Sequence, residues 1–200
     1  MIYLIGSLKN PEIPKIAERL RQQLGVEVFD SWYSPGPEAD DFLRDHLRFR
    51  GLSYPEAMEE HAVRHIFEFD KTHIDRADTV VLVMPAGKSG HLELGYAIGK
   101  GKKGYILFDK EPERFDVMHR FADKVFLSIE DLIKQLSIDA LQDWVQKGRL
   151  KDDERSEMGP VPSGNGPVCG YCKQRPIYEN GRCHSCAQQL RDLGWLQRVP

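Results

Sequence analysis

The sequence predicts an α/β protein built on a doubly wound parallel sheet, followed by a small metal-binding module near the C-terminus. Short apolar runs alternate with segments whose apolar residues recur at helical spacing, which is typical of parallel strands joined by helical crossovers. The run 79–84 (TVVLVM) is β-branched and almost continuously apolar, as expected of a central strand covered on both faces. Four cysteines between positions 169 and 186 indicate the separate module.

The other elements are predicted from apolar periodicity and from glycine and proline punctuation. Residues 2–6 (IYLIG) and 26–29 are predicted strands, and the helix between them begins near Pro11 and ends at Gly25. Residues 31–55 contain Ser-Pro-Gly-Pro and many charges, so we expect a long, partly helical excursion over one edge of the sheet. Further helices are expected over residues 55–74, 90–100 and 128–136, and further strands over residues 104–108 and up to Phe126.

The length of 200 residues allows one well-buried domain and a small appendage. Residues 1–148 are predicted to form the sheet domain. Residues 149–167 run from a charged patch into the stretch MGPVPSGNGP, whose glycine, proline and serine content predicts a flexible linker. Residues 168–200 contain the cysteines and are predicted to form the second unit.

The composition is that of an ordinary globular protein, with 40% apolar and 30% charged residues. A formal net charge of -3 provides no basic field for wholesale binding of a nucleic-acid backbone. No stretch approaches the roughly 18 apolar residues that span a bilayer, and the N-terminus has no basic lead segment. We therefore expect a cytoplasmic protein without membrane insertion.

The cysteines form two Cys-x-x-Cys pairs, separated by ten residues that include the turn signal Asn180-Gly181. Two such knuckles bring four thiolates to one centre, which is the tetrahedral set that structural Zn²⁺ prefers. The alternative is a pair of redox motifs. A mild excess of basic residues in this module permits contact with nucleic acid or protein, and the alternative is a unit that packs on its own enzyme or mediates assembly. The expected zinc ligands are Cys169, Cys172, Cys183 and Cys186.

Ligands of doubly wound sheets bind beyond the carboxyl ends of the strands, so the segments after Gly6 and Met84 are expected at the site. Glu93 follows the Gly-rich loop 87–90 in the first part of a predicted helix, where the helix dipole favours an ionised carboxylate. Asp70, about two turns before the central strand, is expected to reach the same edge. Two carboxyl groups are what glycosidic cleavage requires. A glutamate in a first helical turn is also, ordinarily, a surface residue that satisfies the dipole.

The segment GHLELGYAIGKGKKGYIL, residues 90–107, resembles the Glu-Leu-Gly-Tyr-Ala signature of nucleoside 2-deoxyribosyltransferases. Asp70 and Asp78 have the spacing of two aspartates in that family, the second of which opens the central strand. Ile2-Tyr3 matches the family's N-terminal strand. The resemblance covers roughly residues 1–137.

This resemblance implies a flavodoxin-like α/β fold and a double displacement with no organic cofactor. The Glu93 carboxylate would attack C1′ of a deoxyribosyl group and expel the base. Asp70 would exchange a proton with the base, and Tyr3 would orient Glu93 by a hydrogen bond. The intermediate would then be captured by another base or by water. Since no 2′-oxygen opposes positive charge at C1′, 2′-deoxy substrates are favoured on chemical grounds.

Residues 114–126 (RFDVMHRFADKVF) match, more faintly, a family segment whose polar residue and methionine enter the site of the neighbouring subunit. The resemblance therefore implies a homo-oligomer in which Asp116 and Met118 contact the substrate. Both residues also have an ordinary reading as loop and packing residues.

One departure from the family leaves the substrate open. Gly87 stands where the transferases carry an acidic residue and the related deoxynucleoside 5′-monophosphate N-hydrolases carry a phosphate-binding serine. Ser89 and Gly90 lie in the same loop, and Ser7 follows Gly6 at the other strand end, so their hydroxyls and N–H groups offer a phosphate site. Ser89 alternatively caps the helix. Both nucleosides and nucleotides therefore remain candidates.

Three further residues are candidates for the substrate pocket. His91 reaches either the base or a phosphate, or is an ordinary partly buried histidine. Asp30 and Trp32 line the base pocket, because aromatic faces suit nucleobases, or else belong to the core. The competing hypothesis for the whole chain is a non-catalytic module that holds a nucleotide while the zinc tail recruits protein or nucleic acid.

Overall fold

The computed structural model describes residues 1–155, with side chains described to residue 146. Five strands form one sheet in the order β2-β1-β3-β4-β5, and every neighbouring pair is parallel. This order is that of flavodoxin-like sheets, which confirms the predicted doubly wound parallel architecture. The strands are β1 (Ile2–Ile5), β2 (Val28–Phe29), β3 (Thr79–Val83), β4 (Lys103–Leu107) and β5 (Lys124–Phe126).

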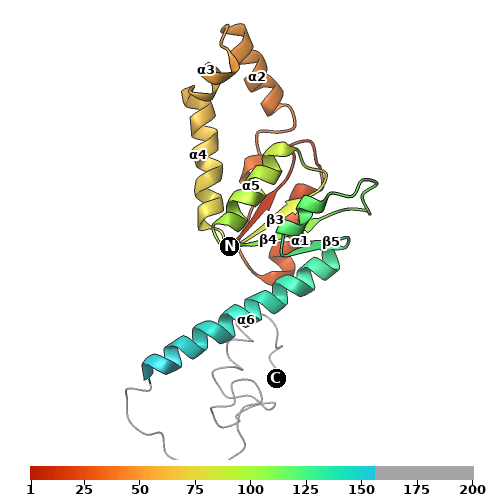
Figure 1. Ribbon diagram of the computed structural model, residues 1–200, viewed down its shortest axis with the longest axis vertical. Coiled ribbons are helices and arrows are strands. Elements are labelled where there is room, and N and C mark those ends of the chain that lie inside the picture. Colours follow the sequence, from red (N-terminus) through yellow and green to blue (C-terminus); the bar gives the residue numbers. More distant parts are fainter. Residues whose placement is uncertain (156–200) are drawn as a thin grey trace, which may run out of the picture. The chain divides into compact units, whose positions relative to one another are not determined.

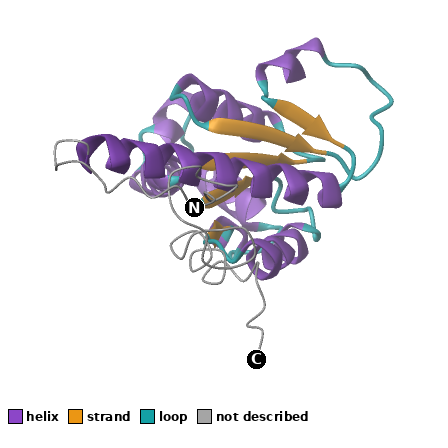
Figure 2. Ribbon diagram, turned by 90° about the horizontal axis from the view of Figure 1, so that it is seen from below, coloured by secondary structure: helices purple, strands orange, loops and turns teal. Residues whose placement is uncertain are grey.

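Helices connect the strands and lie on both sides of the sheet (Figures 1 and 2). Two short 3-10 turns, η1 and η2, follow β2 and precede β5. The helical elements are α1 (Ile13–Leu24), η1 (Ser31–Tyr33), α2 (Ala39–Phe49), α3 (Tyr54–Met58), α4 (His61–Arg76), α5 (Lys88–Gly99), η2 (Val117–Phe121) and α6 (Ile129–Arg155).

The crossover rule assigns α1 and α5 to opposite faces. The chain steps outward from β1 to β2 in one direction and from β3 to β4 in the other, and both connections are expected to be right-handed. Arg19 of α1 pairs with Glu130 at the start of α6 at 2.5 Å. On the other face, the Tyr96 hydroxyl of α5 donates to Asp75 of α4 at 2.8 Å. Helices α4 and α5 are therefore neighbours on one face of the sheet.

The central strand β3 is buried at all five positions, as the apolar run predicted. Its neighbours β1 and β4 are in register with it, so that Val80 lies between Tyr3 and Gly104. Helix α5 packs closely on this part of the sheet. A β-carbon built on Gly90 would lie 3.0 Å from Leu82 and 3.1 Å from Ile5. The glycine therefore permits close contact between the helix and the strands.

The excursion between β2 and β3 consists of three helices, α2, α3 and α4, with α3 at the end remote from the sheet (Figure 1). Leu47 and Ala57 are buried between these helices. Large apolar side chains remain exposed, up to 91% for Phe49. We call this set the apolar excursion surface, and it comprises Phe42, Phe49, Tyr54, Met58, Ile66 and Phe67.

Helix α6 is longer than predicted. Its expected end was residue 136, and residues 149–155 were assigned to the linker, yet the helix continues to Arg155. No proline interrupts this stretch, and its leucine, lysine, glutamate and arginine residues favour a helix. The chain divides within α6 into the units Met1–Ile133 and Lys134–Pro200. Among the described residues, none of the helices has the length and apolar character needed to cross a membrane.

Substitution of Gly104 tests how closely α5 packs against β4. A β-carbon at this position would lie 2.6 Å from Cγ1 of Ile98 and 3.1 Å from Leu94, so Gly104→Ala forces the helix or its side chains to move. We expect the free energy of unfolding to fall by about 1–3 kcal/mol. Gly99→Ala is the matched control, because nothing lies within 4 Å of its added carbon. Urea unfolding should show the control unchanged or more stable; equal losses in both variants contradict the packing argument.

Candidate active site

Three ionisable side chains, those of Tyr3, Asp70 and Glu93, come from three separate elements and meet on the face of the sheet covered by α4 and α5. Tyr3 of β1 is 1% exposed and forms a hydrogen bond with the Asp70 carboxyl group of α4. Glu93 lies in the second turn of α5, close to both of these groups. Its charge raises the pKa of Tyr3, and the charge of Asp70 raises the pKa of Glu93. The two carboxyl groups that the sequence suggested are therefore brought together.

The tyrosine contact differs in one respect from the expectation. Tyr3 was expected to orient Glu93, whereas the hydrogen bond that the structure records from this phenol goes to Asp70. Burial raises the pKa of the Tyr3 hydroxyl, and the charges of Glu93 and Asp70 raise it further. The phenol therefore stays protonated and acts as a donor that fixes Asp70.

Burial also controls Glu93. It raises the pKa of this carboxyl group from 4.5 to about 7, and the negative charge of Asp70 contributes to the same shift. The expectation that the helix N-terminus would favour the ionised form is therefore wrong. Helix α5 begins at Lys88, so Glu93 lies beyond the first turn, where the dipole is effective, and desolvation dominates.

The pKa of the Asp70 carboxyl group is also raised, as the net result of opposing effects. Burial raises the pKa of the Asp70 carboxyl group, while His73 and the Tyr3 hydrogen bond lower it. Asp40 of α2 raises it again, which shows that the N-terminal end of the excursion lies near the site. Oδ1 of Asp70 is buried and has no hydrogen-bond partner. Buried polar atoms are rarely left unpaired, so this oxygen is available to a ligand.

An aromatic stack supports the tyrosine. The Tyr3 ring stacks on Phe29 with centroids 5.2 Å apart, and Phe29 stacks in turn on His73 at 3.8 Å. His73 belongs to α4, three residues after Asp70, and its Nδ1 lies 2.7 Å from the Phe69 carbonyl oxygen. The stack thus connects β1, β2 and α4 behind the two carboxyl groups.

Asp30 and Trp32, predicted to line the base pocket, make structural contacts. Arg21 of α1 pairs with Asp30, whose side chain is only 15% exposed, and also donates to the Val28 carbonyl oxygen at 2.7 Å. The Trp32 indole nitrogen donates to the Leu4 carbonyl oxygen at 2.7 Å. These contacts hold the ends of β1 and β2 together.

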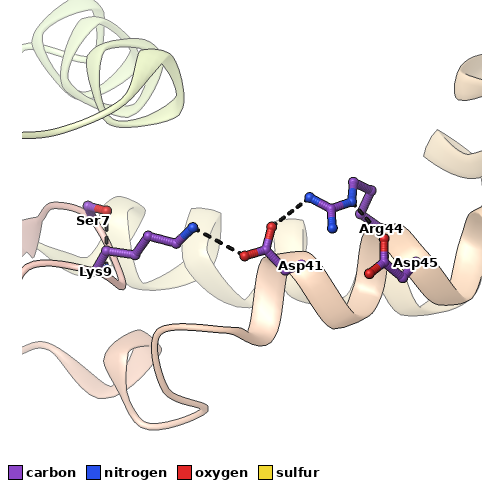
Figure 3. A network of polar contacts seen from close by, with 5 residues as sticks. All are labelled: Ser7, Lys9, Asp41, Arg44 and Asp45. Carbon is purple, nitrogen blue, oxygen red and sulfur yellow. Dashed lines mark hydrogen bonds and ion pairs between the residues drawn. The ribbon is translucent and has the colours of Figure 1, made fainter.

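The loop after β1 is connected to the excursion by ion pairs (Figure 3). Ser7 Oγ accepts a hydrogen bond from the Lys9 backbone N–H at 3.2 Å, which gives this hydroxyl a role within the loop. The Lys9 ammonium pairs with Asp41 of α2 at 3.1 Å, and Arg44 pairs with the same carboxylate at 2.6 Å. A β-carbon on Gly6 would lie 2.5 Å from Ile13, so the glycine permits α1 to approach.

The start of α5 differs from the expectation. Gly87 is the N-cap and the helix begins at Lys88, so the alternative that Ser89 caps the helix is wrong: Ser89 is an exposed residue of the first turn. Gly90 faces the sheet and serves close packing. His91 Nδ1 lies 2.9 Å from the Gly87 carbonyl oxygen, which secures the ring against the first turn.

The segment before β5 contains a residue that sequence reasoning missed. Asp116 caps η2 by accepting from the Met118 backbone N–H at 2.9 Å, and the Met118 side chain is 62% exposed. His119, in the same turn, stacks on His91 with centroids 5.7 Å apart and lies edge-on to Phe108. A single histidine in a loop gives no sequence signal, because only the fold brings η2 beside α5. The four cysteines lie outside the described residues.

The raised pKa of Glu93 predicts a stability effect with a definite sign. The folded state holds a proton on this group up to about pH 7, while the unfolded chain releases it near pH 4.5, so folding stability falls as the pH rises between these values. The glutamine in Glu93→Gln cannot ionise, so this variant does not lose that stability as the pH rises. We compare the free energy of unfolding of the variant with that of the parent chain. The difference, variant minus parent, should rise by on the order of 2 kcal/mol from about pH 5 to about pH 8.

Urea unfolding followed by circular dichroism at the two pH values measures this change. Glu130→Gln is the control: the ion pair with Arg19 lowers the pKa of Glu130 to about 2, so its effect should be the same at both pH values. If the Glu93→Gln difference is independent of pH, the carboxyl group is not buried as described.

Comparison with known proteins adds no identification to this geometry. No family model matches the chain, and no curated protein matches it. The likeness of the Glu93 segment to deoxyribosyltransferases therefore depends on the residues quoted for it, and its chemical implications are proposals.

Proposed function

We propose that this protein cleaves or transfers the N-glycosidic bond of 2′-deoxynucleosides or their 5′-monophosphates through a covalent deoxyribosyl–Glu93 intermediate. The observation that supports this most strongly is the pairing of Glu93 and Asp70 in a buried setting that raises the pKa of both. Perturbed carboxyl pairs of this kind are typical of sites that perform acid–base and nucleophilic chemistry on a glycosidic bond.

The first displacement assigns different tasks to the two groups. An ionised Glu93 oxygen forms a bond to C1′ while the bond from C1′ to the base nitrogen breaks, and the electron pair of that bond leaves with the base. The two coupled carboxyl groups hold one proton between them, and in the reacting state it lies on Asp70, which delivers it to the base, so that the base departs neutral. The unpartnered Oδ1 is the atom free to carry that proton, since the Tyr3 hydroxyl already bonds to this carboxyl group.

The second displacement regenerates the enzyme. Water or the ring nitrogen of an incoming base attacks C1′, the bond to Glu93 breaks, and Asp70 takes up the proton that the attacking group loses. The burial that raises the pKa of Glu93 makes its carboxylate a stronger nucleophile and a poorer leaving group, and near pH 7 a substantial share of the molecules holds it in the ionised form that attacks. A 2′-deoxy sugar favours both steps because no electron-withdrawing oxygen opposes charge at C1′.

Substitution of the two carboxyl groups tests the reaction. Incubation with a panel of deoxynucleosides and their 5′-monophosphates, followed by chromatography of the free base, should show release by the parent chain. Glu93→Ala should reduce that release by at least about a thousandfold, and Asp70→Asn by about a hundredfold or more. Glu68→Ala, an exposed carboxyl on α4, is the control. Undiminished release by Glu93→Ala excludes the nucleophile, and stoichiometric binding without turnover favours the binding-module hypothesis.

We propose that the four C-terminal cysteines hold one structural Zn²⁺. Four protein thiolates leave no coordination position open, so the metal would stabilise the fold of its own module and take no part in the reaction. The support is the sequence pattern of two Cys-x-x-Cys pairs.

Metal analysis tests the zinc module. The purified chain should contain about one zinc ion per molecule, and the double variant Cys169→Ser, Cys172→Ser should contain almost none. Base release should survive in the double variant, because a metal with four protein ligands has no open position for the reaction. Loss of activity that added Zn²⁺ restores would contradict a purely structural metal.

We further propose that the chain is a homo-oligomer. Large exposed apolar side chains are candidates for surfaces of association, and the apolar excursion surface holds six of them on three successive helices. The segment around Met118 also exposes Phe115 and Phe121, at 88% and 73%. Burial of these groups against a second copy is the ordinary way in which a chain of this size would cover them.

A further inference from the structure

Beside the carboxyl pair lies a titratable side chain to which the proposed reaction assigns no step. His73 follows Asp70 by three residues on α4, so the two side chains lie on the same face of the helix. The His73 ring stacks on Phe29 with centroids 3.8 Å apart and planes 16° apart, and it is tilted against the Phe69 ring at 4.5 Å. The imidazole is therefore held between two aromatic rings, next to the proposed proton donor.

A hydrogen bond fixes the orientation of this imidazole. Nδ1 of His73 lies 2.7 Å from the Phe69 carbonyl oxygen, which can only accept, so Nδ1 carries a proton. The neutral ring holds its single proton there, and a second proton can be added only at Nε2. His73 can therefore gain or lose a charge while its hydrogen bond and its stacking stay in place.

The rings behind Asp70 form one column that runs from α4 to β1. His73 packs on Phe29, and Phe29 packs on Tyr3 with centroids 5.2 Å apart. The Tyr3 hydroxyl donates to the Asp70 carboxyl group. Loss of the His73 ring would leave one face of Phe29 without support, and the phenol that fixes Asp70 would then be free to move.

The charge of His73 also acts on Asp70 directly. Burial raises the pKa of the Asp70 carboxyl group, and His73 opposes this rise more strongly than the Tyr3 hydrogen bond does. Asp40 of α2 acts on Asp70 in the opposite direction, and the charge of Asp70 raises the pKa of Glu93 on α5. Among the described residues, Asp70 is the one charged group that interacts with His73. A positive His73 therefore favours an ionised Asp70 and leaves the shared proton to Glu93.

We propose that His73 is a positioning residue for the proton donor: its neutral form leaves the shared proton on Asp70, and its protonated form transfers that proton to Glu93. This inference rests on the proposed function. A proton from solvent on Nε2 stops the first displacement, because Asp70 then has no proton to deliver and Glu93 is no longer an anion. Imidazoles ordinarily change charge between pH 5 and 8, so the effect belongs to the acid side of the working range.

The acid side of the pH–rate profile tests the role of charge. Below about pH 7 the logarithm of kcat/KM falls as Glu93 takes up a proton, and in the parent chain His73 takes up a second one. His73→Phe keeps an aromatic ring that cannot be charged. The limiting slope should therefore be steeper by about one in the parent chain than in this variant, because ionisation of the substrate is the same in both. Equal slopes overturn the proposal.

Two further variants test the support of Asp70 and the specificity of the effect. His73→Ala should lower kcat at pH 8 by about tenfold or more, with KM changed less than about threefold, and His73→Phe should recover most of that loss because it restores the stacked ring. A phenylalanine variant no more active than the alanine variant overturns the supporting role. His65→Phe is the matched control: this exposed histidine of α4 stacks on His61, and its slope should equal that of the parent chain.

A titration without substrate separates this inference from the reaction. The imidazole nitrogen resonances of His73 should report protonation at a lower pH in Asp70→Asn than in the parent chain, by about 0.5 or more, because the carboxylate that stabilises the imidazolium is absent. The resonances of His65 should not change. If the His73 difference appears and no substrate releases base, the coupling of His73 to Asp70 stands and the proposed reaction fails. An unchanged His73 titration overturns the inference whether or not base is released.

Discussion

Two half-buried carboxyl groups are held together over a buried phenol, and the chemistry available to this protein follows from that constraint. Parallel pairing of β1 with β3 fixes Tyr3 in the core, while the contact between α4 and α5 brings Asp70 and Glu93 over it. Burial raises the pKa of all three groups because it weakens the solvation of charge, and the charge of Asp70 raises the pKa of Tyr3 and of Glu93 further, whereas the Tyr3 hydrogen bond lowers that of Asp70. The fold thereby keeps a proton available near neutral pH beside a carboxylate.

The charged surroundings of this centre are acidic on the side of α2. Asp40 from α2 adds negative character near Asp70, and the neighbouring cations Lys9 and Arg21 are neutralised by their own partners. On the opposite flank of α5, the stacked histidines lie without a competing carboxylate contact among the described interactions.

The excursion of α2, α3 and α4 links the Asp70–Glu93 pair to the apolar excursion surface. Helix α4 supplies Asp70 from its C-terminal half, in which Ile74 is buried, while its N-terminal half carries Ile66 and Phe67 on the apolar excursion surface. A partner that covers this surface would therefore contact the same helix that carries Asp70.

The sequence alone was sufficient to predict the doubly wound sheet, because an apolar run such as 79–84 has few alternatives to a buried parallel strand. It also singled out Glu93 and Asp70. It missed the ionisation state of Glu93, the length of α6 and the pairing of His119 with His91. The local sequence pattern predicts which secondary structure a segment favours. Desolvation and contacts between distant segments depend instead on which surfaces the folded chain brings together.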